Sequence, residues 1–193
     1  MKSIILSIQP KWVAKILNGE KTIEVRKSCP KETPFKVYIY CTKGAELWSE
    51  PKSDDGYNVY GNKLNGKVVA SFICDKVDFL APKGIKDIPL YYSDKWLKGM
   101  ISKACLTCNE AIAYQNNKSD LYALHISKLK IYNKPKEIGE FKHFCEDEKK
   151  CDNCKHLFCV DCEHTYPAYD CDVDGLKPIE KAPQNFIYCE ELI

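Results

Sequence analysis

The segment from Pro10 to Lys27 constrains the fold of this chain more than any other stretch. Proline suits the first turn of a helix, where the backbone nitrogen needs no partner. The next residues place four apolar side chains at the spacing of one helix face: Trp12, Val13, Ile16 and Leu17. Gly19 supplies a left-handed stop. Residues 22–27 then alternate, so the segment predicts a short helix and a strand with Glu24 and Arg26 on one face.

Runs of β-branched and aromatic residues recur along the rest of the chain, whereas only two further regions have helical spacing. Strands are predicted at residues 3–8, 35–41, 67–79, 121–132 and 185–190, and helices at 89–104 and 107–114. The second of these helices begins with the capping-box pattern Thr-Cys-Asn-Glu. Many strands with few helices indicate the α+β class, as a small β-barrel flanked by a few helices.

Charge is distributed unevenly although the net charge is only +2. Residues 1–43 carry nine basic and three acidic side chains, while residues 145–174 carry nine acidic and three basic ones. Arg26 is the only arginine, against 28 lysines. A lone guanidinium in such a lysine-rich chain indicates a position that needs a planar, forked donor, and the basic N-terminal part suits a polyanion. An exposed ion pair with Glu24 is the ordinary alternative.

The apolar runs limit the location of the protein. None approaches the roughly 18 residues that span a bilayer, so we expect no membrane partner. The first apolar run stops at Ile8, too early for a secretory signal, and a cytoplasmic location is expected.

Twelve cysteines are many for 193 residues, and six of them cluster near the C-terminal end. Without a secretory signal, such clustering favours metal over a disulfide framework. Two adjacent CxxC pairs with two flanking cysteines predict a structural zinc site: Cys145, Cys151, Cys154, Cys159, Cys162 and Cys171. His143, His156 and His164 are alternative ligands, and disulfides or an iron–sulfur centre remain alternative states. The segment has few large aliphatic residues, so metal binding would supply the free energy to fold it.

Several motifs resemble the ASCH domain family of the PUA-like superfamily, in the type found in phages and bacteria. The most specific motif is Gly-Glu-Lys-Thr-Ile-Glu-Val-Arg at residues 19–26. Further similar segments lie at residues 5–10, 66–72, 121–126 and 182–186. The resemblance leaves out the loop at 44–65 and the cysteine cluster. We therefore divide the chain into a barrel, residues 1–142 and 176–193, and a Cys-rich metal-binding insertion, residues 143–175.

The resemblance implies a closed β-barrel with a cleft that binds RNA or a modified nucleoside. One branch of the family removes the acetyl group from acetylated cytidine nucleosides, and another is linked to RNA cleavage. The deacetylating branch uses a lysine, a threonine three positions later and a distant glutamate. Lys21 matches the lysine, but Glu24 stands at the threonine position. The resemblance therefore supports a ligand of this type more than it supports this reaction.

The residues themselves suggest how such a ligand would be held. Lys21 and Arg26 suit phosphate oxygens, and Glu24 suits an exocyclic amine of a base. A tyrosine would stack a base, with Tyr40 as the candidate and Tyr38, Tyr91 and Tyr92 as alternatives. His125 is a further candidate, and Gln184 follows from the resemblance alone.

Two other functions stay open at this stage. In the first, the protein is a hydrolase of RNA or an acylated nucleoside, with Glu24 as general base and Lys21 stabilising the developing anion. In the second, the acidic insertion docks a protein partner. We favour binding over catalysis, because a plain ion pair between Lys21 and Glu24 would look the same in the sequence.

Overall fold

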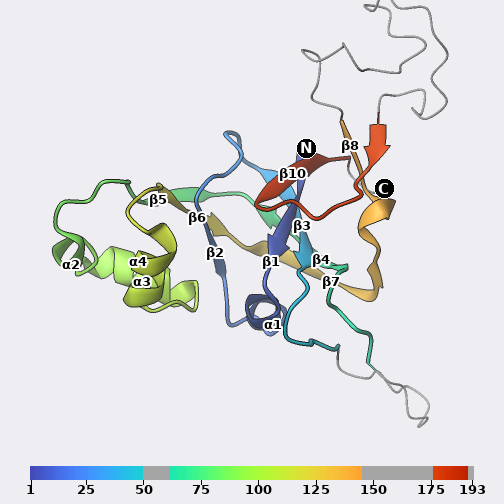
Figure 1. Ribbon diagram of the computed structural model, residues 1–193, viewed down its shortest axis with the longest axis horizontal. Coiled ribbons are helices and arrows are strands. Elements are labelled where there is room, and N and C mark those ends of the chain that lie inside the picture. Colours follow the sequence, from blue (N-terminus) through green and yellow to red (C-terminus); the bar gives the residue numbers. More distant parts are fainter. Residues whose placement is uncertain (50–60, 145–175, 191–193) are drawn as a thin grey trace, which may run out of the picture.

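The computed structural model describes residues 1–49, 61–144 and 176–190, which form two larger β-sheets, a two-stranded sheet and a few helices (Figure 1). The larger sheet has the order β10-β1-β3-β4-β7. Its strands are β1 (Ser3–Ile8), β3 (Phe35–Cys41), β4 (Val68–Cys74), β7 (Ser127–Lys136) and β10 (Phe186–Cys189). The smaller sheet has the order β2-β6-β5, formed by β2 (Ile23–Arg26), β6 (Leu121–His125) and β5 (Val77–Ala81). The predicted α+β class is confirmed.

Two long strands predicted from the sequence are each bent, so that each contributes one strand to either sheet. The prediction of one strand at 67–79 becomes β4 and β5, and that at 121–132 becomes β6 and β7. The antiparallel pairing continues through the bend, since Ile73 faces Ser127 on one side and Val77 faces Leu124 on the other. A register shift between Ser71 and Ile73 lies next to the bend, and the ladder of the smaller sheet has its shift farther along, between Phe79 and Ala81. Alternation alone marks an extended chain but not a corner within it, which is why the sequence predicted single strands.

The sheets are joined on one side by these bent strands and remain unpaired on the other. Within the described residues no backbone ladder links β2 to β1 or β10, so the closed barrel implied by the resemblance is not formed by strand pairing there. Side chains bridge the gap instead. Arg26 Nη2 donates to the carbonyl of Ser7, 2.5 Å away, and Asn185 Nδ2 donates to Ser28 Oγ. We call this unpaired junction between β1 and β2 the seam.

Helix α1 (Pro10–Leu17) leads from β1 toward β2 and packs on the larger sheet. Val13 and Ile16 are fully buried in a core with strand residues such as Phe35 and Phe72. The helix ends as predicted, because Gly19 adopts φ +76°, a conformation that costs glycine little. This turn sets the direction in which the chain enters β2.

The helices α2 (Ile88–Tyr91), α3 (Lys95–Lys103) and α4 (Cys108–Gln115) form a lobe beside the smaller sheet (Figure 1). The predicted capping box is confirmed, because Thr107 and Glu110 bond each other's backbone nitrogen at 3.1 and 2.8 Å. Ile23 and Val25 from β2 pack into the core of this lobe. The opposite face of β2, which carries Glu24 and Arg26, is thereby turned toward the seam.

The predicted insertion is flanked by paired strands. After the short helix η1 (Ile138–Glu140), β8 (Lys142–Phe144) runs antiparallel to β9 (Leu176–Pro178), so the predicted boundary at residue 143 falls inside a strand. The six predicted zinc ligands lie outside the described residues. Within the described ranges no helix has the length and apolar character needed to cross a membrane.

Candidate binding site

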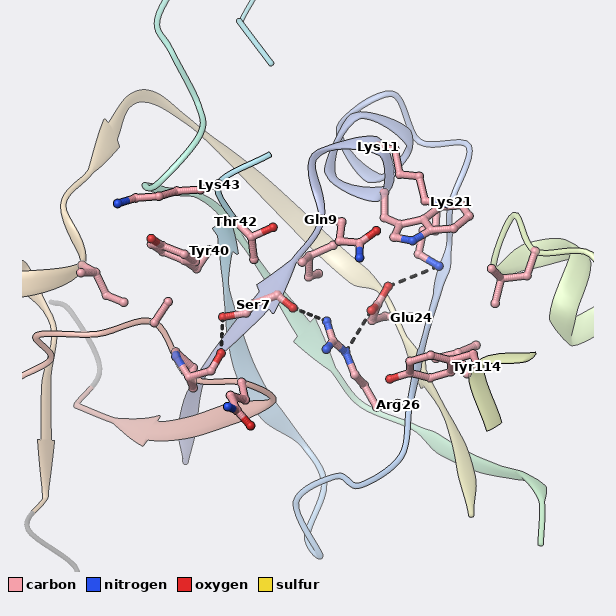
Figure 2. Close-up of a pocket in the computed structure, with 18 of the residues that line it drawn as sticks. Ser7, Gln9, Lys11, Lys21, Glu24, Arg26, Tyr40, Thr42, Lys43 and Tyr114 are labelled. Carbon is pink, nitrogen blue, oxygen red and sulfur yellow. Dashed lines mark hydrogen bonds and ion pairs between the residues drawn. The ribbon is translucent and has the colours of Figure 1, made fainter. Parts of the chain in front are cut away.

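The candidate site is built on a chain of buried charges along β2. The exposed fractions of Lys21, Glu24 and Arg26 are only 3%, 5% and 8%. Buried charges are costly unless they pair, and these three pair with one another (Figure 2). Lys21 Nζ lies 3.3 Å from Glu24 Oε2, and Arg26 Nε lies 3.0 Å from Glu24 Oε1. The predicted ligand-binding trio is therefore one connected network rather than an exposed salt bridge.

Backbone carbonyls hold the two ends of the network. Lys21 Nζ donates to the carbonyl of Ala104, 2.7 Å away at the end of α3, and Arg26 Nη2 donates to Ser7 across the seam. Ser7 in turn donates from its hydroxyl to the carbonyl of Pro183 at 2.6 Å. The network thus ties the helical lobe, β2, β1 and the loop before β10 into one wall.

The network is not saturated with hydrogen bonds. Glu24 Oε2 and Arg26 Nε make no hydrogen bond of acceptable geometry, although both lie at ion-pair distance from a partner. Buried polar atoms are normally hydrogen-bonded, so such atoms require an explanation such as a ligand or a water. Both residues also line a cavity.

The cavity lies at the seam and has a volume of about 930 Å³. It is lined by residues from both sides of the seam, from α4 and from the loop at 180–184. Five basic and three acidic residues line it: Lys11, Lys21, Arg26, Lys43 and Lys181, with Glu24, Glu110 and Glu180. Its charge is therefore mainly positive, which favours an anionic or strongly dipolar ligand.

Three aromatic side chains also line the cavity: Trp12, Tyr40 and Tyr114. Lys11 and Lys21 place their ammonium groups 4.2 and 5.1 Å from the centre of the Trp12 ring. Burial raises the pKa of Tyr40. Burial also raises the pKa of Tyr114, against the lowering effect of the Arg26 charge, so this phenol lies within the field of the network. These neutral rings provide apolar faces beside the charged ones.

Of the remaining predicted residues, the structure places some at the cavity and others away from it. Tyr40 and Gln184 line the cavity. His125 does not line it; its Nε2 lies 2.7 Å from Asp78 Oδ2, on the β5–β6 pair. Tyr38 and Tyr92 are buried, and Tyr92 donates to Gln115 at 3.0 Å. Tyr91 is half-buried and does not line the cavity. Of the tyrosines considered in the sequence, the structure thus brings only Tyr40 to the network's cavity.

Several cavity residues were missed in the sequence. Trp12 was predicted only as part of an apolar helix face, and Tyr114 only as a helix residue. Lys11 and Lys43 gave no signal among 28 lysines. Gln9 lies in the 5–10 segment of the resemblance, and this segment is the one signal that points to the β1 side of the cavity.

The part of the chain that the structure describes holds no cluster of three or more cysteine, histidine or acidic side chains arranged for a metal. The described cysteines are free thiols: Cys29, Cys41, Cys74, Cys105, Cys108 and Cys189. The zinc prediction rests on the residues outside this part.

Of three comparisons with known proteins, only the one with solved structures found matches. No family model and no curated protein sequence matches the chain. Among solved structures, the ASCH protein of Zymomonas mobilis matches at 15% identity with a TM-score of 0.46, covering 71% of this chain and 74% of that one. A point mutant of that protein matches at 14% identity with a TM-score of 0.45, covering 72% and 77%. Both carry the name of the family that the sequence motifs resemble.

Proposed function

We propose that this protein binds RNA or a modified nucleoside in the cavity at the seam. The observation that carries the proposal is the buried network of Lys21, Glu24 and Arg26, which forms a cavity wall and includes two buried polar atoms without a hydrogen bond. A purely structural ion network would be expected to satisfy its own atoms. The motif at residues 19–26, which resembles the ASCH signature, coincides with this wall.

The size and lining of the cavity suit a nucleoside. A volume of about 930 Å³ lies within the range of roughly 300–1,000 Å³ for small-molecule sites. Bases of single-stranded RNA are generally read by stacking on aromatic rings and by hydrogen bonds to their edges. Tyr114 and Tyr40 offer ring faces, while Glu24 accepts from an amine and Arg26 donates to a carbonyl or phosphate oxygen.

Binding measurements on site variants test the proposal. Lys21→Ala and Arg26→Ala should each weaken binding of short single-stranded RNAs or nucleosides at least tenfold, because each removes a cation from the cavity wall. Lys98→Ala, an exposed lysine on α3 outside the cavity, is the matched control and should bind as the unmodified protein does. Urea unfolding would show that the variants are folded under binding conditions. Unchanged affinity in folded Lys21→Ala and Arg26→Ala would refute the site.

Hydrolysis of RNA or an acylated nucleoside is the second candidate, because Lys21 places a buried amine beside a carboxylate in the cavity wall. One observation weighs against it. Thr22 is exposed and does not line the cavity, so it does not replace the missing hydroxyl. Product formation that is lost in Glu24→Gln while RNA still binds would establish the enzyme.

We also propose that the insertion binds a structural zinc ion through four of its clustered thiolates. The support is the pair of CxxC motifs, Cys151 with Cys154 and Cys159 with Cys162, in a segment poor in aliphatic residues. Docking of a protein partner on the acidic insertion stays a separate prediction. A pulldown that requires residues 143–175 but not Lys21 would favour it.

A further inference from the structure

We infer that the cavity receives an internal nucleotide of a single RNA strand, with its neighbouring phosphates on Lys43 and Lys11, rather than a free nucleoside. The inference rests on the proposed function and specifies its ligand. It rests on which charged side chains of the cavity have a partner within the protein and which do not.

Two acidic groups that line the cavity, the buried Glu24 and the exposed Glu110, are already engaged. Glu24 contacts both Lys21 and Arg26. Glu110 accepts from the Thr107 nitrogen at 2.8 Å and from its hydroxyl at 3.0 Å, and these bonds lower the pKa of Glu110. Neither carboxylate forms an ion pair, among the described residues, with a lysine at the cavity mouth.

The lysines at the mouth carry uncompensated charge. Lys43 and Lys181 are exposed and form no ion pair or hydrogen bond within the described part of the chain. Lys11 is also exposed and lies against the Trp12 ring rather than against a carboxylate, with Glu110 as a distant electrostatic neighbour. Two exposed glutamates, Glu110 and Glu180, also line the cavity. Three exposed lysines thus stand against two exposed glutamates, which leaves the mouth with a net positive charge.

These cations stand on different sides of the buried network. Figure 2 shows Lys43 beside Tyr40 and Thr42 on one side, and Lys11 near Lys21 on the other. Lys43 follows β3, whereas Lys11 belongs to α1. Glu24 and Arg26 lie between the two sides. If the base of a nucleotide points at this network, Lys43 therefore lies toward one of the neighbouring phosphates and Lys11 toward the other.

A free nucleoside carries no phosphate and would leave both lysines unmatched. An internal nucleotide has a phosphodiester on each side, and each contact with a lysine releases counterions from the strand. This distribution of charge, with a polar network at the floor and cations at two sides of the mouth, is the pattern expected when a base enters and the backbone stays outside.

The test compares four fluorescein-labelled RNA homopentamers with the four matching nucleosides, measured by anisotropy and by competition over a series of salt concentrations. At least one pentamer should bind more than tenfold tighter than its nucleoside. Lys11→Ala and Lys43→Ala should each make the slope of log affinity against log salt shallower by about 0.7, and the double variant by about twice that. Nucleoside affinity should fall by a smaller factor than pentamer affinity in these variants, and Lys98→Ala should retain the original slope.

The outcomes separate this inference from the proposed function. If nucleosides bind as tightly as pentamers, or if the slopes are unchanged in Lys11→Ala and Lys43→Ala, the inference is wrong and the site is one for free nucleosides. If neither probe binds the unmodified protein, both proposals fail. Because Lys11 and Lys43 are exposed, their replacement should leave the unfolding midpoint unchanged, and this control is measured on the same samples.

Discussion

Replacement of Glu24 by alanine should destabilise the protein far more than loss of an ordinary salt bridge. Among the residues that the structure describes, Glu24 is the only acidic residue in contact with Lys21 and Arg26, whose side chains are just 2% and 10% exposed. The variant leaves both cations buried, each with a single carbonyl acceptor, Ala104 for the lysine and Ser7 for the arginine. Two buried charges would then lack a counter-charge.

The expected cost is about 3–5 kcal/mol, the range observed when one partner of a buried pair is removed. The loss should lie near the upper end of this range because two buried cations would lack a counter-charge. Water that enters the adjacent cavity would reduce the loss toward the lower end. Because small domains are stable by only about 5–15 kcal/mol, the loss is a large part of the total. With a urea m-value of about 2 kcal/mol/M, the midpoint should fall by roughly 1.5–2.5 M.

Urea unfolding followed by fluorescence measures this shift, and Glu20→Ala is the matched control. Glu20 pairs with Lys15 at 3.1 Å, but both side chains are exposed, so the control should leave the midpoint unchanged. The reasoning is refuted if Glu24→Ala shifts the midpoint no more than Glu20→Ala does. An unchanged m-value would show that the denatured state is not the source of the difference.

Three further outcomes are expected. Arg26→Lys should lower both RNA affinity and the unfolding temperature, because an ammonium group lacks the fork that reaches Glu24 and Ser7 together; equal values in both assays would contradict this role. The purified protein should contain about one zinc ion per chain by elemental analysis, and Cys154→Ser should lower this content; a metal-free protein would contradict the zinc site. Burial raises the pKa of Cys74 from 9.0 to about 12, so its stabilising contribution is complete below pH 9 and is lost as pH rises toward 12. Unfolding free energy should therefore fall across this range, less steeply in Cys74→Ala, and a flat profile would contradict the burial argument.

Local patterns in the sequence predicted local structure well. The proline, the apolar stripe and Gly19 gave helix α1 and its end, and the capping box gave the start of α4. The alternation over residues 22–27 correctly placed Glu24 and Arg26 on one face of β2. These features depend on neighbours a few residues apart, which a single sequence contains.

The cavity depends on contacts between distant segments, and the sequence does not contain these. Arg26 meets Ser7 from another strand, and Lys21 meets the carbonyl of Ala104, 83 residues away. Nothing near Tyr114 in the sequence indicates that α4 is folded back against the seam. His125 shows the converse, since it pairs with Asp78 on the neighbouring strand and does not reach the cavity.

We propose that the network at the seam is kept for binding rather than for stability. Apolar residues at these positions of β2 should give the protein an equal or higher free energy of unfolding. Replacing a whole buried ion network by apolar side chains is often neutral or stabilising by about 1–4 kcal/mol. The triple variant Lys21→Met, Glu24→Leu and Arg26→Met should therefore unfold at a higher urea concentration than Glu24→Ala, and yet bind no RNA. A triple variant that binds RNA like the unmodified protein would show that the charges serve only the fold. A triple variant less stable than Glu24→Ala would show that the network holds the seam together. Where local rules of stability are broken at a cavity wall, function is the expected reason.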